Sequence, residues 1–226
     1  MPSLAERLGV IQDGVADAAA RAGRGLDEIT TIVVTKFHPA AMVRELYALG
    51  VRDFGENRHQ EAQAKSAELA DLADPPLKWH FIGQLQSKKA RQAREYASVI
   101  HSLDRDSVVD ALASPGRALD CFVQLNLTDD QGRGGVQDAL LEPLVERVLA
   151  TSGLRLLGVM AVAPLDEEPR RAFARLRTAS LRIQSLEPEA RFISAGMSGD
   201  YADAIAEGAT HLRIGSAITG NRPTAG

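Results

Sequence analysis

Lys36 is the residue whose type and position most directly suggest chemistry. It follows the run from Ile32 to Thr35, where a buried strand would end and where an α/β barrel places its active site. A lysine at the end of so apolar a strand is expected to be partly desolvated, which favours the neutral amine that attacks carbonyl groups. A Schiff-base role fits these features. The alternative is a lysine whose aliphatic stem merely carries the ammonium to solvent.

Two turns rich in glycine and serine have the composition of a phosphate-binding site. One runs from Ser194 to Gly199 after the seventh expected strand, and the other is Gly215-Ser216 after the eighth. Barrels bind phosphate there through backbone N–H groups, hydroxyls and a helix N-terminus, which a helix from Asp200 would supply. Each turn alone could simply connect a strand to a helix. In a closed barrel, however, strand eight lies beside strand one, so the turns and Lys36 together indicate a phosphate next to an amine.

A ligand that carries both a carbonyl group and a phosphate can be pyridoxal 5'-phosphate (PLP) or a phosphorylated sugar, and other residues fit PLP. Arg213 suits the pyridine nitrogen of PLP, and because it stays charged it would disfavour protonation there and weaken the ring as an electron sink. Asn57 could hydrogen-bond the side of the ring that carries the hydroxyl, with Glu56 orienting it or pairing with a neighbouring base. His80 and Met160 could line the pocket, although packing usually suffices to explain a methionine at a strand end.

The elements that must position these residues alternate along the chain as repeated βα units. Strands are expected at Thr30–Lys36, Arg52–Asn57, Trp79–Gly83, Val99–Leu103, Leu119–Leu127, Arg155–Val162, Arg191–Ala195 and His211–Gly215. Helices are expected between them at Ala40–Leu49, His59–Leu72, Ser87–Tyr96, Asp106–Ala113, Leu140–Thr151, Glu168–Ser185 and Asp200–Glu207. Ser3 and Glu6 form a capping box that opens an extra N-terminal helix. Eight strands favour a single (β/α)8 barrel of the TIM type over an open doubly wound sheet, so we expect one PLP-binding domain over residues 1–226.

Composition and charge exclude several classes of function. The chain carries a formal charge of −4 with its Lys and Arg spread along the sequence, so neither nucleic acid nor an anionic membrane is an expected partner. The longest apolar runs are too short to cross a bilayer and no signal peptide is evident, so we expect a cytoplasmic protein. The five histidines lack the spacing of metal ligands, so we expect no metal site, and the lone Cys121 is expected in the core.

Seven short motifs between Thr30 and Gly220 resemble the PLP homeostasis proteins, also called the proline synthase co-transcribed family. They are VTK at 34–36, FGEN at 54–57, WHFIG at 79–83, LQSK at 85–88, GVM at 158–160, SAGMS at 194–198 and LRIGS at 212–216. The resemblance implies a barrel like the N-terminal domain of alanine racemase, with PLP on Lys36. It also implies that Ser198, Gly215 and Ser216 hold the phosphate, that Arg213 faces the pyridine nitrogen and that Asn57 lies near the ring.

Three positions depart from the family's usual pattern. Ala195 stands where methionine is common, and Ser216 stands where threonine is common but keeps a hydroxyl. The segment from Asp129 to Gly135 contains Arg133 and lacks an expected lysine, which argues against a second PLP-exchange role for this loop.

The resemblance implies a PLP carrier that influences amino- and keto-acid pools, without an established catalytic activity. We therefore expect a monomeric, non-enzymatic protein whose partners are PLP, free amino acids and PLP-dependent apo-enzymes. The alternative is a PLP-dependent amino-acid racemase of low activity, since alanine racemase also has an Arg at the pyridine nitrogen. A racemase needs a base on each face of the α-carbon, and of the chain's tyrosines only Tyr201 is placed near the expected site. A third possibility is an aldolase-like barrel with a colourless Schiff base between Lys36 and a sugar phosphate.

Overall fold

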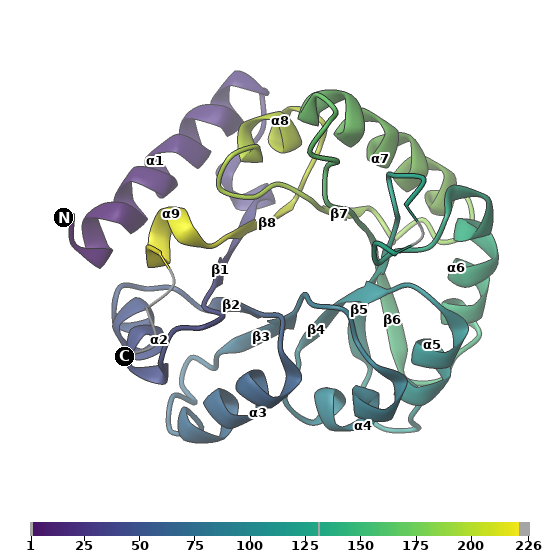
Figure 1. Ribbon diagram of the computed structural model, residues 1–226, viewed down its shortest axis with the longest axis horizontal. Coiled ribbons are helices and arrows are strands. Elements are labelled where there is room, and N and C mark those ends of the chain that lie inside the picture. Colours follow the sequence, from purple (N-terminus) through teal and green to yellow (C-terminus); the bar gives the residue numbers. More distant parts are fainter. Residues whose placement is uncertain (1, 131, 222–226) are drawn as a thin grey trace.

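A closed barrel of parallel strands forms the centre of the molecule. The computed structural model describes residues 2–130 and 132–221. The strands pair in sequence order, and β1 also pairs with β8, which closes the barrel (Figure 1). Their bounds are β1 Thr30–Val34, β2 Asp53–Glu56, β3 Lys78–Phe81, β4 Val99–Leu103, β5 Leu119–Gln124, β6 Leu154–Met160, β7 Phe192–Ser194 and β8 His211–Ile214. The predicted (β/α)8 barrel is confirmed.

Helices surround the barrel and connect successive strands (Figure 1). The α-helices are α1 Leu4–Arg21, α2 Ala40–Ala48, α3 His59–Glu68, α4 Ser87–Tyr96, α5 Asp106–Leu112, α6 Leu141–Leu149, α7 Pro169–Gln184, α8 Tyr201–Ala206 and α9 Ser216–Thr219, and the 3-10 helices are η1 Leu26–Glu28 and η2 Asp138–Leu140. The predicted capping box opens α1, because the Ser3 hydroxyl accepts from the Glu6 N–H and the Glu6 carboxylate accepts from the Ser3 N–H. This extra helix packs beside α8 and α9, where the Arg7 Nε donates to the Ile218 carbonyl at 2.6 Å.

Side chains alternate along each strand between an outer core and the barrel interior. The outer core lies between sheet and helices and includes the fully buried Cys121, as predicted. Burial raises the pKa of this thiol, so Cys121 behaves as an apolar side chain. On the same strand, Phe122 faces inward and joins Met160 and Val99 in a small separate cluster. Polar side chains share the interior with this cluster, since the His101 ring stacks on Phe122 with centroids 4.6 Å apart.

Several strands end earlier than predicted from the sequence, with β1 and β5 as examples. β1 ends at Val34 and β5 ends at Gln124, whereas the sequence predicted strands to Lys36 and Leu127. Leu125 and Leu127 are buried all the same, because the loop after β5 packs its apolar residues against the outer core. Because these buried loop residues are also apolar, the hydrophobic pattern in the sequence extends past the last residue of the strand.

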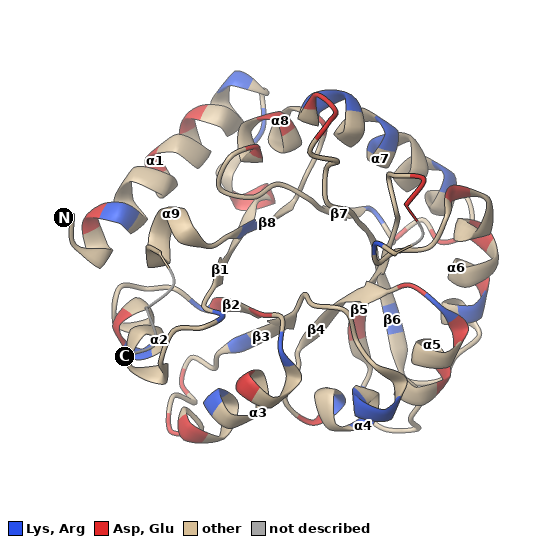
Figure 2. Cartoon of the chain, in the orientation of Figure 1, with Lys and Arg blue, Asp and Glu red and all other residues tan. Residues whose placement is uncertain are grey.

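Charged side chains of both signs are spread over the outer helices (Figure 2). Within residues 2–130 and 132–221, no helix is both long and apolar enough to cross a membrane. Over the same residues, no group of His, Cys, Asp and Glu side chains is arranged to hold a metal ion.

Candidate functional site

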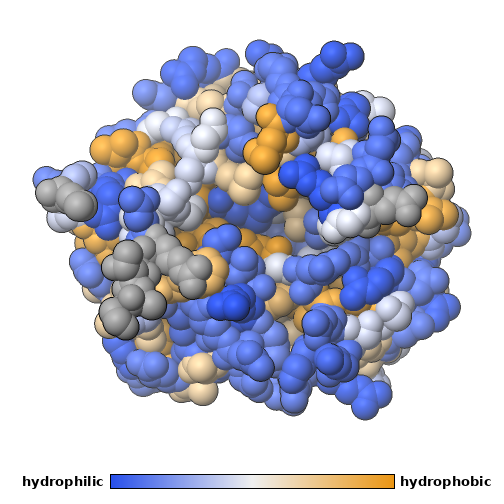
Figure 3. Space-filling view, in the orientation of Figure 1, coloured by the Kyte–Doolittle hydropathy of each residue, from blue (hydrophilic) through white to orange (hydrophobic). Residues whose placement is uncertain are grey.

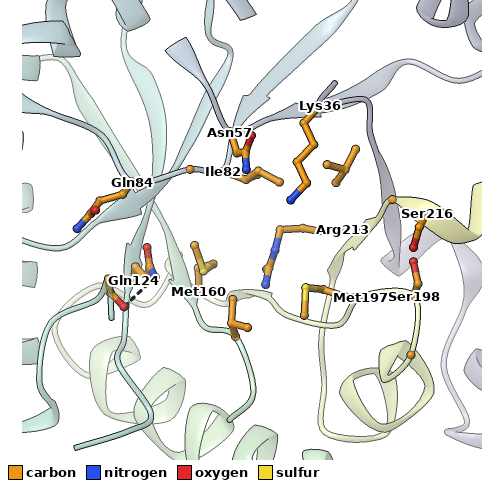
Figure 4. A pocket seen from close by; sticks show the side chains of 16 residues that line it. Lys36, Asn57, Ile82, Gln84, Gln124, Met160, Met197, Ser198, Arg213 and Ser216 are labelled. Carbon is orange, nitrogen blue, oxygen red and sulfur yellow. Dashed lines mark hydrogen bonds between the residues drawn. The ribbon is translucent and has the colours of Figure 1, made fainter. Parts of the chain in front are cut away.

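The carboxyl ends of the strands surround a cavity of about 570 Å³. The face in Figure 3 is hollowed near its centre, and Figure 4 shows the side chains that point into this space. Seven of the residues singled out from the sequence come from different strands or the loops that follow them and line this one cavity: Lys36, Asn57, Met160, Ser198, Arg213, Gly215 and Ser216. A cavity of this size is typical of sites for small ligands.

Lys36 enters the cavity from a turn that follows β1, and its amine points toward Arg213 in Figure 4. The side chain is exposed, so the expectation that an apolar strand would desolvate it was wrong. The physical reason is that β1 ends at Val34, and the chain has left the sheet by the time it reaches the lysine. The next residue, Phe37, has a φ of 68°, a left-handed conformation that is uncommon for a residue with a side chain.

Helix α3 holds this turn on both sides of the lysine. The Lys65 Nζ donates to the Thr35 carbonyl at 2.7 Å, just before Lys36, and the Glu61 carboxylate accepts from the Phe37 N–H at 2.5 Å, just after it. Lys65 and Glu61 are themselves paired at 2.8 Å across one helical turn. The turn that presents Lys36 is therefore fixed by α3 directly after the last bond to the sheet, which the Thr35 N–H donates to the Gly55 carbonyl at 3.0 Å.

Lys65 also pairs with the Glu56 carboxylate beneath the turn. Lys65 Nζ lies 2.7 Å from the Glu56 Oε1, which also accepts from the Thr35 hydroxyl at 2.7 Å. The Lys65 and Glu56 side chains are only 7% and 1% exposed, and burial raises the pKa of the Glu56 carboxyl against the opposing effect of Lys65. Of the two roles considered for Glu56, the structure shows pairing with a base.

Asn57 lies at the edge of the cavity beside Lys36 (Figure 4). Its Oδ1 is buried and has no hydrogen-bond partner among the described residues, an arrangement that usually has a functional or ligand-related reason. The backbone of Gly83 passes so close that an added Cβ would lie 2.1 Å from the Asn57 carbonyl oxygen. Only glycine allows these two loops to meet at the cavity wall.

The two small-residue turns form one wall of the cavity, where the Ser198 and Ser216 hydroxyls face each other (Figure 4). Ser198 accepts from the Ala217 N–H at 3.4 Å, which ties the turns together. The N–H groups of Ser198 and Gly199 have no acceptor within the described part of the chain. The helix that begins at this wall is α9, at Ser216, and not the predicted α8, whose start near Asp200 does not line the cavity.

Arg213 forms the floor of the cavity and is only 4% exposed. Its Nη1 donates to the Ser194 hydroxyl at 2.7 Å and its Nη2 to the Ala161 carbonyl at 2.8 Å. Burial lowers its pKa to about 10, so the guanidinium remains charged near neutral pH. A guanidinium carries five N–H donors, and these two bonds leave the others available to a ligand above.

Two side chains that were expected at the site lie elsewhere. His80 does not line the cavity, because it projects into the barrel from the middle of β3, where its ring bonds to His101 and Asp53. Tyr201 points toward α1, where its hydroxyl occupies the space that a Cβ on Gly14 would need. The candidate second base of a racemase therefore does not reach the cavity.

Met197 and Gly199 line the cavity from the turn that was predicted to hold phosphate, and Ile82 and Gly83 line it from a segment expected at a strand end. Other lining residues were not proposed as site residues from the sequence: Val34, Gln84, Gln124, Gly134 and Val162. Gln124 was missed because strand five was expected to continue to Leu127, which placed the glutamine in mid-strand instead of at the strand end. Its Nε2 donates to the Gly134 carbonyl at 3.0 Å, which brings the loop after β5 to the cavity. Residue 131 of that loop lies outside the described residues, so the expected behaviour of the segment 129–135 stays a prediction.

Comparisons with known proteins match nearly the whole chain. Residues 7–223 match the family described as "Alanine racemase, N-terminal domain". A protein of Pseudomonas aeruginosa named "Pyridoxal phosphate homeostasis protein" is 41% identical over 230 residues, which cover 98% of this chain and 97% of that protein.

Two solved structures extend the comparison. PipY of Synechococcus elongatus, solved with PLP bound, is 37% identical with a TM-score of 0.79, and the match covers 96% of this chain and 99% of PipY. Alanine racemase from Corynebacterium glutamicum is 16% identical with a TM-score of 0.70; the match covers 95% of this chain and 62% of the racemase. The racemase shares the barrel fold, and the remainder of its chain is not matched.

Proposed function

Because the chain belongs to the family of pyridoxal phosphate homeostasis proteins, we propose that it holds PLP as a Schiff base on Lys36. In this proposal the chain is a single PLP-binding domain that keeps and delivers the cofactor in the cytoplasm. Relatives carry the family's name at 36–41% identity, and PipY was solved with PLP bound.

The cavity residues fit this cofactor. The Lys36 amine and the serine wall stand on different sides of the cavity (Figure 4), as an aldehyde and a phosphate on one ring require. Ser198, Ser216 and the free N–H groups beside them would hold the phosphate. Arg213 would face the pyridine nitrogen from below, and the unpartnered Oδ1 of Asn57 would gain a neighbour at the ring edge. When bound, PLP supplies a carbonyl that condenses with amines and a ring that withdraws electrons.

One observation favours storage over catalysis. Among the described residues that line the cavity, only Lys36 and Arg213 have ionisable side chains. Moving a proton to one face of an α-carbon and away from the other needs two acid–base groups, and Arg213 remains protonated at physiological pH. Lys36 can therefore bind the cofactor and exchange it with free amino acids, while the described part of the cavity lining offers no second group to complete a racemisation.

The test compares the wild-type chain with Lys36→Ala and with Lys88→Ala, which removes an exposed lysine outside the cavity. After loading with PLP and gel filtration, wild type and Lys88→Ala should retain a yellow, stoichiometric cofactor, and Lys36→Ala should not. Loaded wild type should restore activity to an apo-enzyme that requires PLP.

The same samples distinguish the carrier from a racemase. Deuterium exchange at the α-carbon of alanine should stay near the rate given by free PLP. Turnover on the order of 1 s⁻¹ or faster, abolished in Lys36→Ala, would replace the carrier proposal with an enzymatic function. A colourless protein that binds a sugar phosphate on Lys36 would favour the aldolase-like alternative.

A further inference from the structure

A continuous chain of hydrogen bonds runs through the barrel interior from the cavity floor to the opposite end of the barrel. Arg213 Nη1 donates to the Ser194 Oγ at 2.7 Å, and this Oγ lies 2.8 Å from the His101 Nδ1. The His101 Nε2 lies 2.9 Å from the His80 Nδ1, and the His80 Nε2 lies 2.9 Å from the Asp53 Oδ1. Asp53 is the first residue of β2, at the end of the barrel away from the cavity.

Donor and acceptor rules assign a direction to this chain. An arginine can only donate, so Ser194 accepts from Arg213, and its own proton needs an acceptor because the residue is 0% exposed. The acceptor within reach is the His101 Nδ1. A neutral His101 then carries its proton on Nε2 and donates to His80, which in turn donates from Nε2 to the Asp53 carboxylate. Every bond therefore points from the cavity toward Asp53.

The protonation states of the interior agree with this direction. Burial lowers the pKa of His101 well below its ordinary value, so the ring is neutral near pH 7. Burial alone would raise the pKa of Asp53, but the His80 hydrogen bond and nearby positive charges outweigh it and leave that pKa lowered. The terminal acceptor of the chain is thus an anion and its central ring is neutral.

Other charged or titratable groups near the chain do not interrupt it. His211 lies with its ring centroid 6.3 Å from that of His101 and bonds instead to the Thr210 hydroxyl. Lys78 pairs in register with Asp53 at the far end of the barrel and is exposed. Asp200 acts on Arg213 only through its charge. Among the described residues, Arg213 has no directly bonded carboxylate, although a buried cation without one is costly.

We propose that Asp53, His80, His101 and Ser194 are positioning residues for Arg213, and that the Asp53 carboxylate acts through them as its remote counter-charge. The proposal rests on PLP being held above Arg213. Hydrogen bonds in a chain polarise one another, by about 10–30% per bond, so the Asp53 charge makes Ser194 a stronger acceptor. Arg213 then draws fewer electrons from the ring, and the Schiff-base nitrogen on Lys36 stays more basic.

The test uses the pH midpoint of the absorption change of the loaded protein. Asp53→Asn removes the charge but keeps an acceptor, and it should lower the midpoint by ~0.5 pH units. Ser194→Ala cuts the chain beside Arg213 and should lower the midpoint by ~1 unit. Because the chain is already cut, Asp53→Asn should add nothing in the Ser194→Ala background. Lys78→Gln is the matched control, since it removes a charge at the same end of the barrel but outside the chain, and it should leave the midpoint unchanged.

Tautomers provide a readout that does not depend on the cofactor. Imidazole ¹⁵N chemical shifts of the PLP-free chain at pH 7 should show His101 neutral, with its proton on Nε2 and its Nδ1 accepting a hydrogen bond. A proton on the Nδ1 of His101, or equal effects of Asp53→Asn with and without Ser194, would overturn the relay. A midpoint shift by Lys78→Gln as large as that by Asp53→Asn and opposite in sign would show through-space electrostatics instead. A chain that shows the predicted tautomers but never binds PLP would refute the proposed function while leaving the relay's direction intact.

Discussion

Replacing Lys65 with methionine should destabilise the protein and loosen the turn that presents Lys36. The methionine fills most of the space of the lysine but removes three hydrogen bonds, to the Thr35 carbonyl, the Glu56 Oε1 and the Glu61 Oε1. Glu56, which is 1% exposed and already has an unpartnered Oε2, would lose its cation. Because burial already raises the pKa of this carboxyl, it would either stay buried as an uncompensated charge or take up a proton, and both outcomes cost stability. Loss of one member of a buried ion pair typically costs ~3–5 kcal/mol.

The structure also predicts which second substitution compensates. Glu56→Gln removes the stranded charge but still accepts from the Thr35 hydroxyl, so Lys65→Met combined with Glu56→Gln should recover ~1–3 kcal/mol of the loss. An exposed ion pair provides the control: Arg44 and Asp71 are bonded at 2.6 Å with side chains 43% and 60% exposed. Arg44→Met should therefore change the free energy of unfolding by no more than ~1 kcal/mol.

Urea unfolding, followed by far-UV circular dichroism and extrapolated linearly to water, measures these differences. The PLP-free chain should be used so that cofactor binding does not contribute. A cost for Lys65→Met below ~1 kcal/mol, or a double variant less stable than Lys65→Met alone, would refute the buried clamp.

Three further outcomes follow from the site and the interior. Gly83→Ala places a Cβ 2.1 Å from a backbone oxygen, so it should lower the free energy of urea unfolding by ~1–3 kcal/mol and weaken PLP retention. Gly9→Ala, in open space on α1, is the control and should be neutral or stabilising. Equal stability of the two variants would contradict the close approach at Gly83. Burial lowers the pKa of His211 from 6.5 to about 4, so ~3 kcal/mol of stability present above pH 6.5 should be lost as the pH falls toward 4. The free energy of unfolding of His211→Gln should therefore depend less on pH over this range. An unchanged pH dependence would show that His211 does not titrate as described. In absorption titrations, Ser198→Ala should weaken PLP binding roughly 10- to 100-fold with an unaltered spectrum, whereas Arg213→Gln should change the spectrum; identical spectra for wild type and Arg213→Gln would place Arg213 away from the ring.

Most of the architecture could be predicted from the sequence, because most helices and strands show a clear hydrophobic pattern or capping residues. The bounds of Val99–Leu103 and Ser87–Tyr96 agree with the structure, as does the capping box at Ser3. Helix α9 was missed because it has only four residues, too few to show a hydrophobic period. Strand ends were overestimated where loop residues are also buried, as at Leu127.

The cavity residues were predictable because, in a barrel of parallel strands, residues at the carboxyl ends of the strands surround one site. The network around it was not. Lys65 lies on a helix that is otherwise weakly amphipathic, and its pairing with Glu56 depends on how α3 packs. His80, His101 and Ser194 come from three strands separated by 21 and 93 residues, and they meet only because the barrel closes. The available signal was a polar residue inside strands that are otherwise largely apolar, such as His101 in β4 and Arg213 in β8.

The most direct test of the central claim is to locate the covalent bond to PLP. The loaded chain is reduced with borohydride, digested and mapped by mass spectrometry, with Lys36→Ala treated in parallel. The proposal predicts a pyridoxyl group on Lys36 at near-stoichiometric level and none at that position in the variant. Modification of other lysines at equal level in both proteins, with Lys36 unmodified in the wild type, would contradict it.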